Sequence, residues 1–140
     1  MDNMQGFKYS RQVYYYDTDA AGVVYHGNYF HFCEDARTAI FLKLAKMSLK
    51  EYADKTGVGF VISRAQVEYI CPVALNARVD VVTYIESITG VRIKYRHEIW
   101  VGGLMCAVVR LETVSVSTST FRPAKMSAGL FESYKKAFAL

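Results

Sequence analysis

Two carboxylates, two glycines and a histidine stand close together in YYYDTDAAGVVYHGNY, residues 14–29. Gly22 follows Asp19 by three residues, and a glycine allows a tight turn or the close approach of a ligand to the backbone. A helix is predicted to begin near His26, and its first N–H groups lack partners within the helix and carry partial positive charge. A carboxylate that faces such a helix start is typical of acyl transfer, because the carboxylate attacks or activates water while the N–H polarises the carbonyl.

Two other roles are open to the same residues. Aspartates commonly cap turns by accepting hydrogen bonds from backbone N–H groups, and this is the more frequent role of an Asp-x-Asp pair in a loop. A metal site formed by Asp17, Asp19, His26 and His31 has suitable ligand types, but the regular spacing of a motif such as H-E-x-x-H is missing. We therefore predict no metal and no cofactor. No G-x-S-x-G motif of a nucleophilic serine occurs either.

Composition places the chain among globular proteins. Its 140 residues fit one domain, residues 1–140, and 52% of them are hydrophobic while 21% are charged. The net charge of +4 is scattered, which favours an anionic ligand and predicts no nucleic-acid partner. Cys33, Cys71 and Cys106 lie among apolar residues and are predicted to be buried free thiols in a reducing compartment. Since residues 1–10 show no signal peptide and no apolar run approaches about 20 residues, we expect a cytoplasmic protein without membrane insertion.

The spacing of apolar residues predicts the strand and the helix that position the two acids. Residues 7–16 are aromatic and β-prone, which predicts a first strand and makes its tyrosines core or interface residues. On such a strand Asp17 and Asp19 have the same parity, so both side chains are predicted to point the same way. A helix is predicted next, with Gly27 or Asn28 as its N-cap and an end near Met47. Its apolar stripe has three- and four-residue spacings and consists of Tyr29, Phe32, Cys33, Ala36, Ile40 and Leu44.

From residue 58 the apolar period changes to two, as in strands. A short helix over residues 49–55 first ends at Gly57. Strands are then predicted over residues 58–71, 79–85, 91–99 and 104–118, and a last helix over residues 127–138. In the first of these strands Val61, Ala65, Val67 and Tyr69 are predicted to form a dry face opposite Arg64, Gln66 and Glu68. One helix with a single apolar stripe needs a sheet to cover it, so we predict an α+β fold in which a curved antiparallel sheet wraps around one long central helix.

Three segments together resemble a known enzyme family. These are Gln12-Val13 with TDAAGVVYH and Asn28-Tyr29, then FCEDARTAIF at residues 32–41, and FVISRAQVEYICPVAL at residues 60–75. They are similar to the 4-hydroxybenzoyl-CoA thioesterase family of hotdog-fold enzymes, and most closely to its branch of small bacterial acyl-CoA thioesterases associated with the Tol-Pal system. The resemblance covers most of the chain and implies the hotdog fold.

The resemblance separates the roles of the two acids. In the family the catalytic carboxylate directly precedes x-x-Gly-Val-Val, which is Asp19 here, and the carbonyl-polarising N–H belongs to the residue matching His26. Asp17 is then a supporting residue, and the ring of His26 is structural or orienting. The predicted substrate-binding residues are Gly22, Val23, Tyr25, Asn28 and Arg64.

The function implied is hydrolysis of short- to medium-chain acyl-CoA, with aromatic acyl groups left open. Residues 87–91, SITGV, are neutral where the aromatic-substrate members carry a basic cluster, so the phosphate contacts stay unassigned. In this fold two protomers usually join their sheets and complete the site across the interface, which implies a homo-oligomer, either a dimer or a tetramer. Alternative functions are a thioesterase acting on acyl carrier protein, a non-catalytic acyl-CoA-binding module, and a scaffold near the cell envelope.

Overall fold

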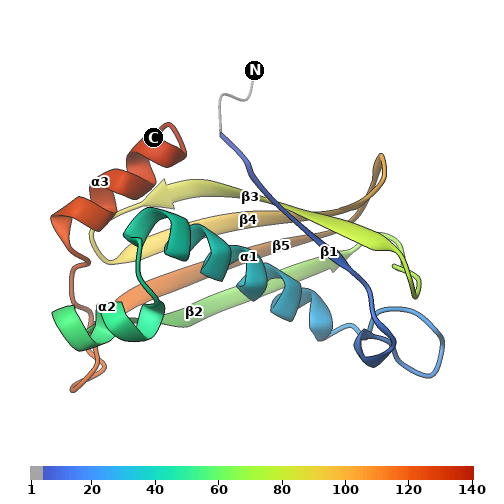
Figure 1. The fold of residues 1–140 in the computed structure, drawn as a ribbon, viewed down its shortest axis with the longest axis horizontal. Helices are drawn as coiled ribbons and strands as arrows, with labels where there is room; N and C mark the ends of the chain where they lie inside the picture. Colours follow the sequence, from blue (N-terminus) through green and yellow to red (C-terminus); the bar gives the residue numbers. More distant parts are fainter. Residues whose placement is uncertain (1–4) are drawn as a thin grey trace.

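The computed structural model describes residues 5–140 and has one antiparallel sheet with a long helix lying across it (Figure 1). The strand order is β1-β3-β4-β5-β2, so β1 and β2 are the two edges. This is the predicted α+β architecture, and the sheet curves around the central helix. Its elements are β1 (Phe7–Gln12), the 3-10 turn η1 (Tyr15–Asp17), α1 (Asn28–Ala45), α2 (Leu49–Thr56), β2 (Val58–Tyr69), β3 (Arg78–Ile88), β4 (Arg92–Val101), β5 (Leu104–Ser117) and α3 (Ala128–Ala137).

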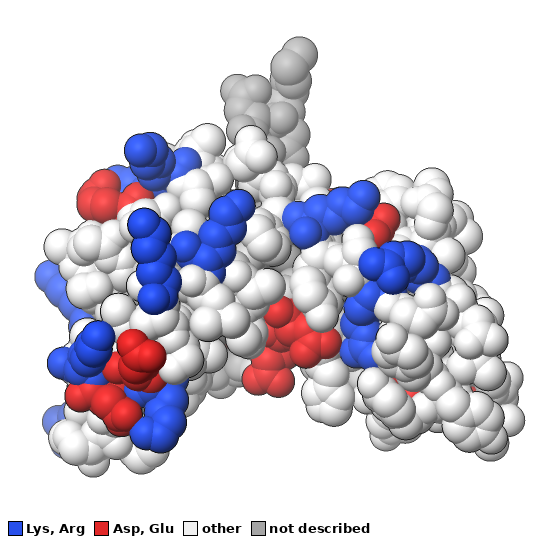
Figure 2. Space-filling model, viewed as in Figure 1, with Lys and Arg blue, Asp and Glu red and all other residues white. Residues whose placement is uncertain are grey.

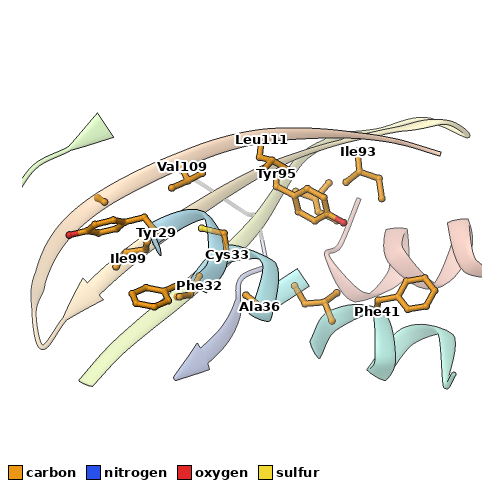
Figure 3. Packing of buried hydrophobic residues seen from close by; sticks show 14 of the residues in the cluster. Tyr29, Phe32, Cys33, Ala36, Phe41, Ile93, Tyr95, Ile99, Val109 and Leu111 are labelled. Atoms are coloured by element: carbon orange, nitrogen blue, oxygen red, sulfur yellow. The ribbon is translucent and has the colours of Figure 1, made fainter. Parts of the chain in front are cut away.

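The apolar stripe of α1 and the inner face of the sheet form the core (Figure 3). Gly27 is the N-cap of α1, and Lys46 ends the helix in the left-handed conformation with φ 56°. Burial of each large apolar side chain against the sheet stabilises the fold by about 1.5–3 kcal/mol. The buried positions of α1 are Tyr29, Phe32, Cys33, Ala36, Ile40 and Phe41, and those opposite them include Ile93, Tyr95, Ile99, Val109 and Leu111.

The first strand is shorter than predicted. It ends at Gln12 because residues 15–17 turn into η1, which the carboxylate of Asp17 closes by accepting the N–H of Tyr14. The side chains of Tyr14, Tyr15 and Tyr16 are therefore exposed, that of Tyr15 by 82%, and lie outside the core of this chain. The other alternative, that these tyrosines are interface residues, stays a prediction.

The dry face predicted for β2 is not covered within one chain. β2 is an edge strand, and its side chains are mostly exposed on both faces, including those of Val61, Ile62 and Tyr69. A register shift between Ile62 and Arg64 also interrupts the simple alternation.

Charged side chains of both signs are interspersed over the face that α1 covers (Figure 2). No helix among residues 5–140 has the length and apolar character needed to cross a membrane. The prediction that residues 1–10 carry no signal peptide falls partly on residues 1–4, which lie outside the described part of the chain.

Candidate active site

Asp19 begins a tight turn between η1 and α1. Its C=O accepts the N–H of Gly22 at 3.0 Å, and its N–H donates to the C=O of Val23 at 3.0 Å. Gly22 has φ +78°, a conformation that favours glycine. The Asp19 Oδ1 accepts the N–H of Ala21 at 2.9 Å, so the carboxylate does cap the turn. The side chain is nevertheless exposed, and its Oδ2 has no partner among residues 5–140.

This turn is fastened to the segment that precedes β3. The N–H of Val24 donates to the C=O of Val73 at 2.8 Å, and the N–H of Leu75 donates to the C=O of Gly22 at 3.2 Å. Val23 forms an isolated β-bridge with Ala74. The backbone of residues 22–24 is therefore held on both sides, and Asp19 projects from a supported turn.

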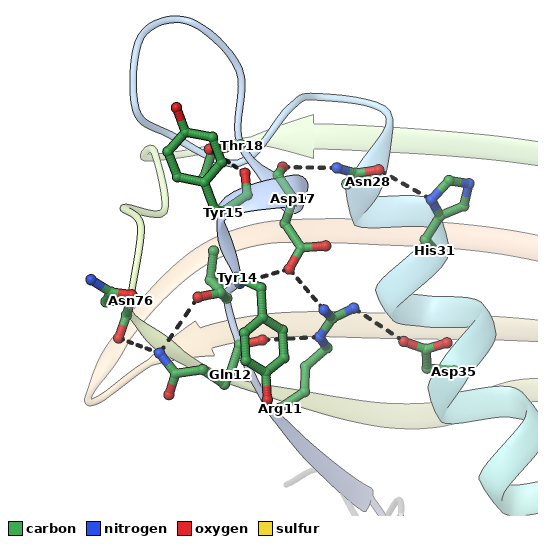
Figure 4. Close-up of polar contacts among 11 residues, drawn as sticks. Arg11, Gln12, Tyr14, Tyr15, Asp17, Thr18, Asn28, His31, Asp35 and Asn76 are labelled. Atoms are coloured by element: carbon green, nitrogen blue, oxygen red, sulfur yellow. Dashed lines mark hydrogen bonds and ion pairs between the residues drawn. The ribbon is translucent and has the colours of Figure 1, made fainter.

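Asp17 has a different environment from Asp19 (Figure 4). Its side chain is 6% exposed, and its Oδ2 accepts the Arg11 Nη2 at 2.8 Å and the N–H of Tyr14 at 2.8 Å. Arg11 also contacts Asp35 at 3.3 Å. The prediction that Asp17 and Asp19 point the same way was wrong: Asp17 is the last residue of η1 and not part of an extended strand, and its side chain is buried while that of Asp19 is exposed. The carboxylate of Asp17 is committed to holding this turn.

The backbone of Asp17 positions the start of α1. Its C=O accepts the N–H of Tyr25 at 2.9 Å and the Asn28 Nδ2 at 2.8 Å. The Asn28 Oδ1 in turn lies 3.1 Å from the His31 Nδ1 (Figure 4). Asn28 therefore joins η1 to the first turn of the helix, and His31 is exposed on that helix.

The peptide N–H groups of His26 and Gly27 are free for a ligand, since neither has an acceptor among residues 5–140. The N–H of Asn28 is already used by the C=O of Tyr25 at 2.9 Å. The Tyr69 hydroxyl donates to the C=O of His26 at 2.7 Å and fixes this peptide. Periodicity missed this role of Tyr69, because the bond joins residues 43 positions apart and no local pattern signals it.

Six of the predicted site residues lie on this one loop and helix start: Asp19, Gly22, Val23, Tyr25, His26 and Asn28. The rings of Tyr25 and His26 lie 4.3 Å apart, and both side chains are exposed. Arg64 is not brought to them within one chain. It lies five residues before Tyr69 on β2, which is about 17 Å along a strand.

A cavity of about 330 Å³ lies farther along α1, between this helix and the edge of the sheet. Its walls combine apolar and polar side chains, among them Glu34, Arg37, Phe41, Phe60, Tyr95 and Tyr134. The cavity lies on the same helix that the free N–H groups of His26 and Gly27 precede.

His97 supports Arg37 beside this cavity. Burial, together with the positive charge of Arg37, lowers the pKa of His97 to about 3, so the imidazole is neutral. The Arg37 Nη1 lies 3.1 Å from the His97 Nε2, which accepts because an arginine only donates. The His97 Nδ1 then donates to the Thr83 Oγ1 at 2.8 Å. The imidazole of His97 is fully buried, and both of its ring nitrogens have partners.

The family of the chain follows from comparison of its sequence with known protein families. The family model described as the thioesterase superfamily matches residues 21–108, which begin two residues after Asp19 and include α1, α2, β2, β3 and β4. The chain belongs to the thioesterase superfamily. This superfamily member is 29% identical over 123 residues to the acyl-CoA thioesterase YbgC of Haemophilus influenzae, and the match covers 88% of each chain.

Solved structures of other proteins resemble the fold of this thioesterase-superfamily chain. The DHNA-CoA thioesterase of Staphylococcus aureus superposes with a TM-score of 0.85 and 27% identity, covering 94% of this chain and 89% of that one. A second Staphylococcus aureus protein, solved in complex with CoA, gives a TM-score of 0.89 at 14% identity over 97% of this chain and 85% of that one. The fold is therefore the hotdog fold.

Proposed function

We propose that this enzyme hydrolyses short- to medium-chain acyl-CoA to the free acid and CoA, with Asp19 as nucleophile or general base. The backbone N–H of His26 is the oxyanion donor, and that of Gly27 lies next to it. The observation that carries the proposal is the presence of an unpartnered carboxylate oxygen and unpartnered N–H groups on one supported loop. The names of the Haemophilus and Staphylococcus relatives, both CoA thioesterases, support the class of substrate.

The chemistry follows from these groups. As nucleophile, the Asp19 Oδ2 attacks the thioester carbonyl carbon, the C–S bond breaks, and CoA leaves as a thiolate that takes up a proton. Water then hydrolyses the resulting anhydride. As general base, Asp19 instead takes a proton from the water that attacks the same carbon; the C–S bond then breaks, and the departing CoA thiolate takes up that proton. In both routes the carbonyl oxygen becomes negative, and the N–H of His26 stabilises it.

Asp19 suits this role better than Asp17 does. The carboxylate of Asp17 is buried and paired with Arg11, so using it would require breaking that pair. The Asp19 carboxylate is exposed, and among residues 5–140 its only hydrogen bond is from the N–H of Ala21. Gly22, Val23, Tyr25, Asn28 and Arg64 remain predicted substrate-binding residues.

We further infer that the enzyme works as a homo-oligomer, a dimer or a tetramer, built by pairing of β2 edges. β2 is twelve residues long, pairs only with β5, and exposes apolar side chains such as Val61 and Ile62. A long edge strand of this kind pairs readily with another chain. Sedimentation velocity tests this inference, and a monomer at micromolar concentration contradicts it.

The decisive measurement is thiol release from a panel of acyl-CoA substrates by the wild type and Asp19→Asn. Loss of the carboxylate is expected to lower kcat by about a thousandfold or more, because an amide is neither nucleophile nor base. The melting temperature should stay within about 2 °C, since Asn can still accept the bond from Ala21. Equal rates in the two proteins refute the assignment. Tight binding of acyl-CoA without thiol release indicates a binding module. If the acyl thioester of acyl carrier protein is hydrolysed faster than acyl-CoA, acyl carrier protein is the carrier on which the enzyme acts.

A further inference from the structure

Two free cysteines meet where the end of β2 lies against β5 (Figure 1). Cys106 is buried near the start of β5, and Cys71 follows the last residue of β2 by two positions. The N–H of Cys71 donates to the C=O of Cys106 at 3.0 Å. A backbone bond of this kind between neighbouring strands places the two Cα atoms about 5 Å apart, which is a distance that a disulfide spans.

The two thiols also lie at the same place. The Cys71 Sγ donates to the C=O of Met105 at 3.8 Å, and the Cys106 Sγ donates to the C=O of Leu104 at 3.6 Å, so both point to the first two residues of β5. Burial, together with contact with the Cys71 thiol, raises the pKa of Cys106 to about 11. The side chains are therefore in contact, which a disulfide requires in addition to a suitable Cα distance.

The three cysteines of the chain differ in their access to solvent. Cys33 is fully buried in the apolar stripe of α1, and burial raises its pKa to about 12. Cys106 is buried as well, whereas Cys71, predicted to be buried, is only half-buried. Buried thiols of high pKa are inert, and an accessible thiol reacts first. An oxidant in solution therefore meets Cys71, with Cys106 as the thiol beside it.

Cys71 lies in the middle of a segment that supports the candidate active site. Two residues before it, the Tyr69 hydroxyl donates to the C=O of His26 at 2.7 Å. Two residues after it, the C=O of Val73 accepts the N–H of Val24 at 2.8 Å. A displacement of Cys71 is therefore transmitted to the peptide whose N–H is the proposed oxyanion donor.

We propose that Cys71 and Cys106 are a reversible oxidation site, whose disulfide loosens the loop of residues 19–27 and thereby slows thioester hydrolysis. The effect on hydrolysis rests on the proposed function. A disulfide draws the two sulfur atoms to about 2 Å from each other, and its sulfurs no longer donate to the main chain of β5. The end of β2 moves with Cys71, and Tyr69 then holds the His26 peptide less firmly.

The oxidant is a small-molecule disulfide such as oxidised glutathione. The Cys71 thiolate attacks one of its sulfur atoms, and one glutathione leaves with the proton that Cys71 has lost. The Cys106 sulfur then attacks the Cys71 sulfur of the mixed disulfide, and the second glutathione leaves with the proton of Cys106. Two protein thiols are thus oxidised while one small disulfide is reduced to two thiols. An excess of reduced thiol reverses both steps.

Intact mass and thioester hydrolysis test the proposal on the full chain. The wild type is incubated with oxidised glutathione, and hydrolysis is followed by the loss of thioester absorbance, to which protein thiols do not contribute. The oxidised protein should be about 2 Da lighter than the reduced protein, and digestion should recover one linked pair of peptides, joining Cys71 to Cys106. Its kcat should be about three- to tenfold lower because the oxyanion donor is misplaced. Dithiothreitol should restore both mass and kcat.

Three variants assign the reaction to its residues. Cys71→Ser should keep the kcat of the reduced wild type within about twofold and should not respond to oxidised glutathione. Cys106→Ala keeps the attacking thiol and should stop at the mixed disulfide, seen as one added glutathione. Cys33→Ala is the matched control and should respond as the wild type does. A response that persists in Cys71→Ser, or a wild-type disulfide that includes Cys33, refutes the proposal.

Hydrogen exchange separates this proposal from the proposed function. Amide exchange in residues 24–28 should be faster in the oxidised than in the reduced protein, whether or not the chain cleaves thioesters. A wild type that forms the disulfide and exchanges faster there, but hydrolyses no acyl-CoA in either state, refutes the proposed function alone. A disulfide that leaves this exchange unchanged, or leaves the kcat of an active enzyme unchanged, overturns the proposal.

Discussion

Replacing Asp17 by Asn separates the buried acid from the exposed one. The Asp17 Oδ2 accepts two hydrogen bonds, each of 2.8 Å, from Arg11 and from the N–H of Tyr14. Asn keeps an acceptor oxygen of the same reach but removes the charge. The Arg11 side chain, which is 15% exposed, then keeps Asp35 at 3.3 Å as its remaining acidic partner.

The expected cost is a loss of stability. A hydrogen bond to a charged group contributes about 1.5–3 kcal/mol and a neutral one about 0.5–1.5 kcal/mol, so two weakened bonds cost about 2.5 kcal/mol. With an unfolding entropy of about 0.3 kcal/mol/K for a chain of this length, the melting temperature should fall by about 9 °C. Turnover at 25 °C should stay within about fivefold, because Tyr25 and Asn28 bond to the backbone C=O of Asp17.

The assay combines thermal unfolding at pH 7 with thiol release at 25 °C, on Asp17→Asn and Asp19→Asn in parallel. The two variants should show opposite behaviour: the first loses stability and keeps turnover, and the second keeps stability and loses turnover. If Asp17→Asn instead abolishes turnover at an unchanged melting temperature, the roles assigned to the two acids are reversed.

Two further predictions concern the supports of the site. Tyr69→Phe removes the hydroxyl that bonds to His26, so kcat should fall about three- to tenfold for a lost bond of about 1 kcal/mol, with KM unchanged; an unchanged kcat contradicts this role. Because burial lowers the pKa of His97 to about 3, the unfolded chain takes up a proton there that the folded chain does not, and stability should fall as the pH drops from about 6.5 toward 4. Urea unfolding at several pH values should show that the free energy of unfolding changes less with pH in His97→Gln than in the wild type. An identical pH dependence in the two proteins refutes the reasoning.

Local patterns were sufficient to predict most of the fold. The spacing of Tyr29, Phe32 and Ala36 predicts α1 because a helix repeats within a few residues, and Gly57 marks the end of α2 for the same local reason. The end of β1 could not be predicted in this way. It depends on Asp17 bonding to the N–H of Tyr14 while Arg11 neutralises the acid, and the alternation of apolar and polar residues does not encode these side-chain contacts.

The site was predictable only in part. The resemblance of residues 18–26 to a family motif distinguishes Asp19 from Asp17, whereas their equal parity on a strand predicted the wrong orientation. Tyr69 could not be found, because its contact with His26 joins distant segments. The exposure of β2 also escaped prediction, since alternation shows that a face is apolar but does not show whether this chain or another covers it.

Three side-chain bonds anchor α1 to its surroundings: Asn28 to η1, Asp35 to β1 and Arg37 to β4. They span about 14 Å of the helix axis, so the helix can neither slide nor rotate without breaking one of them. In protein engineering, α1 is consequently not an exchangeable module. A chimera that takes this helix from a relative has to take the matching residues of β1 and β4 with it, and crossover points belong after Lys46, where the helix has ended.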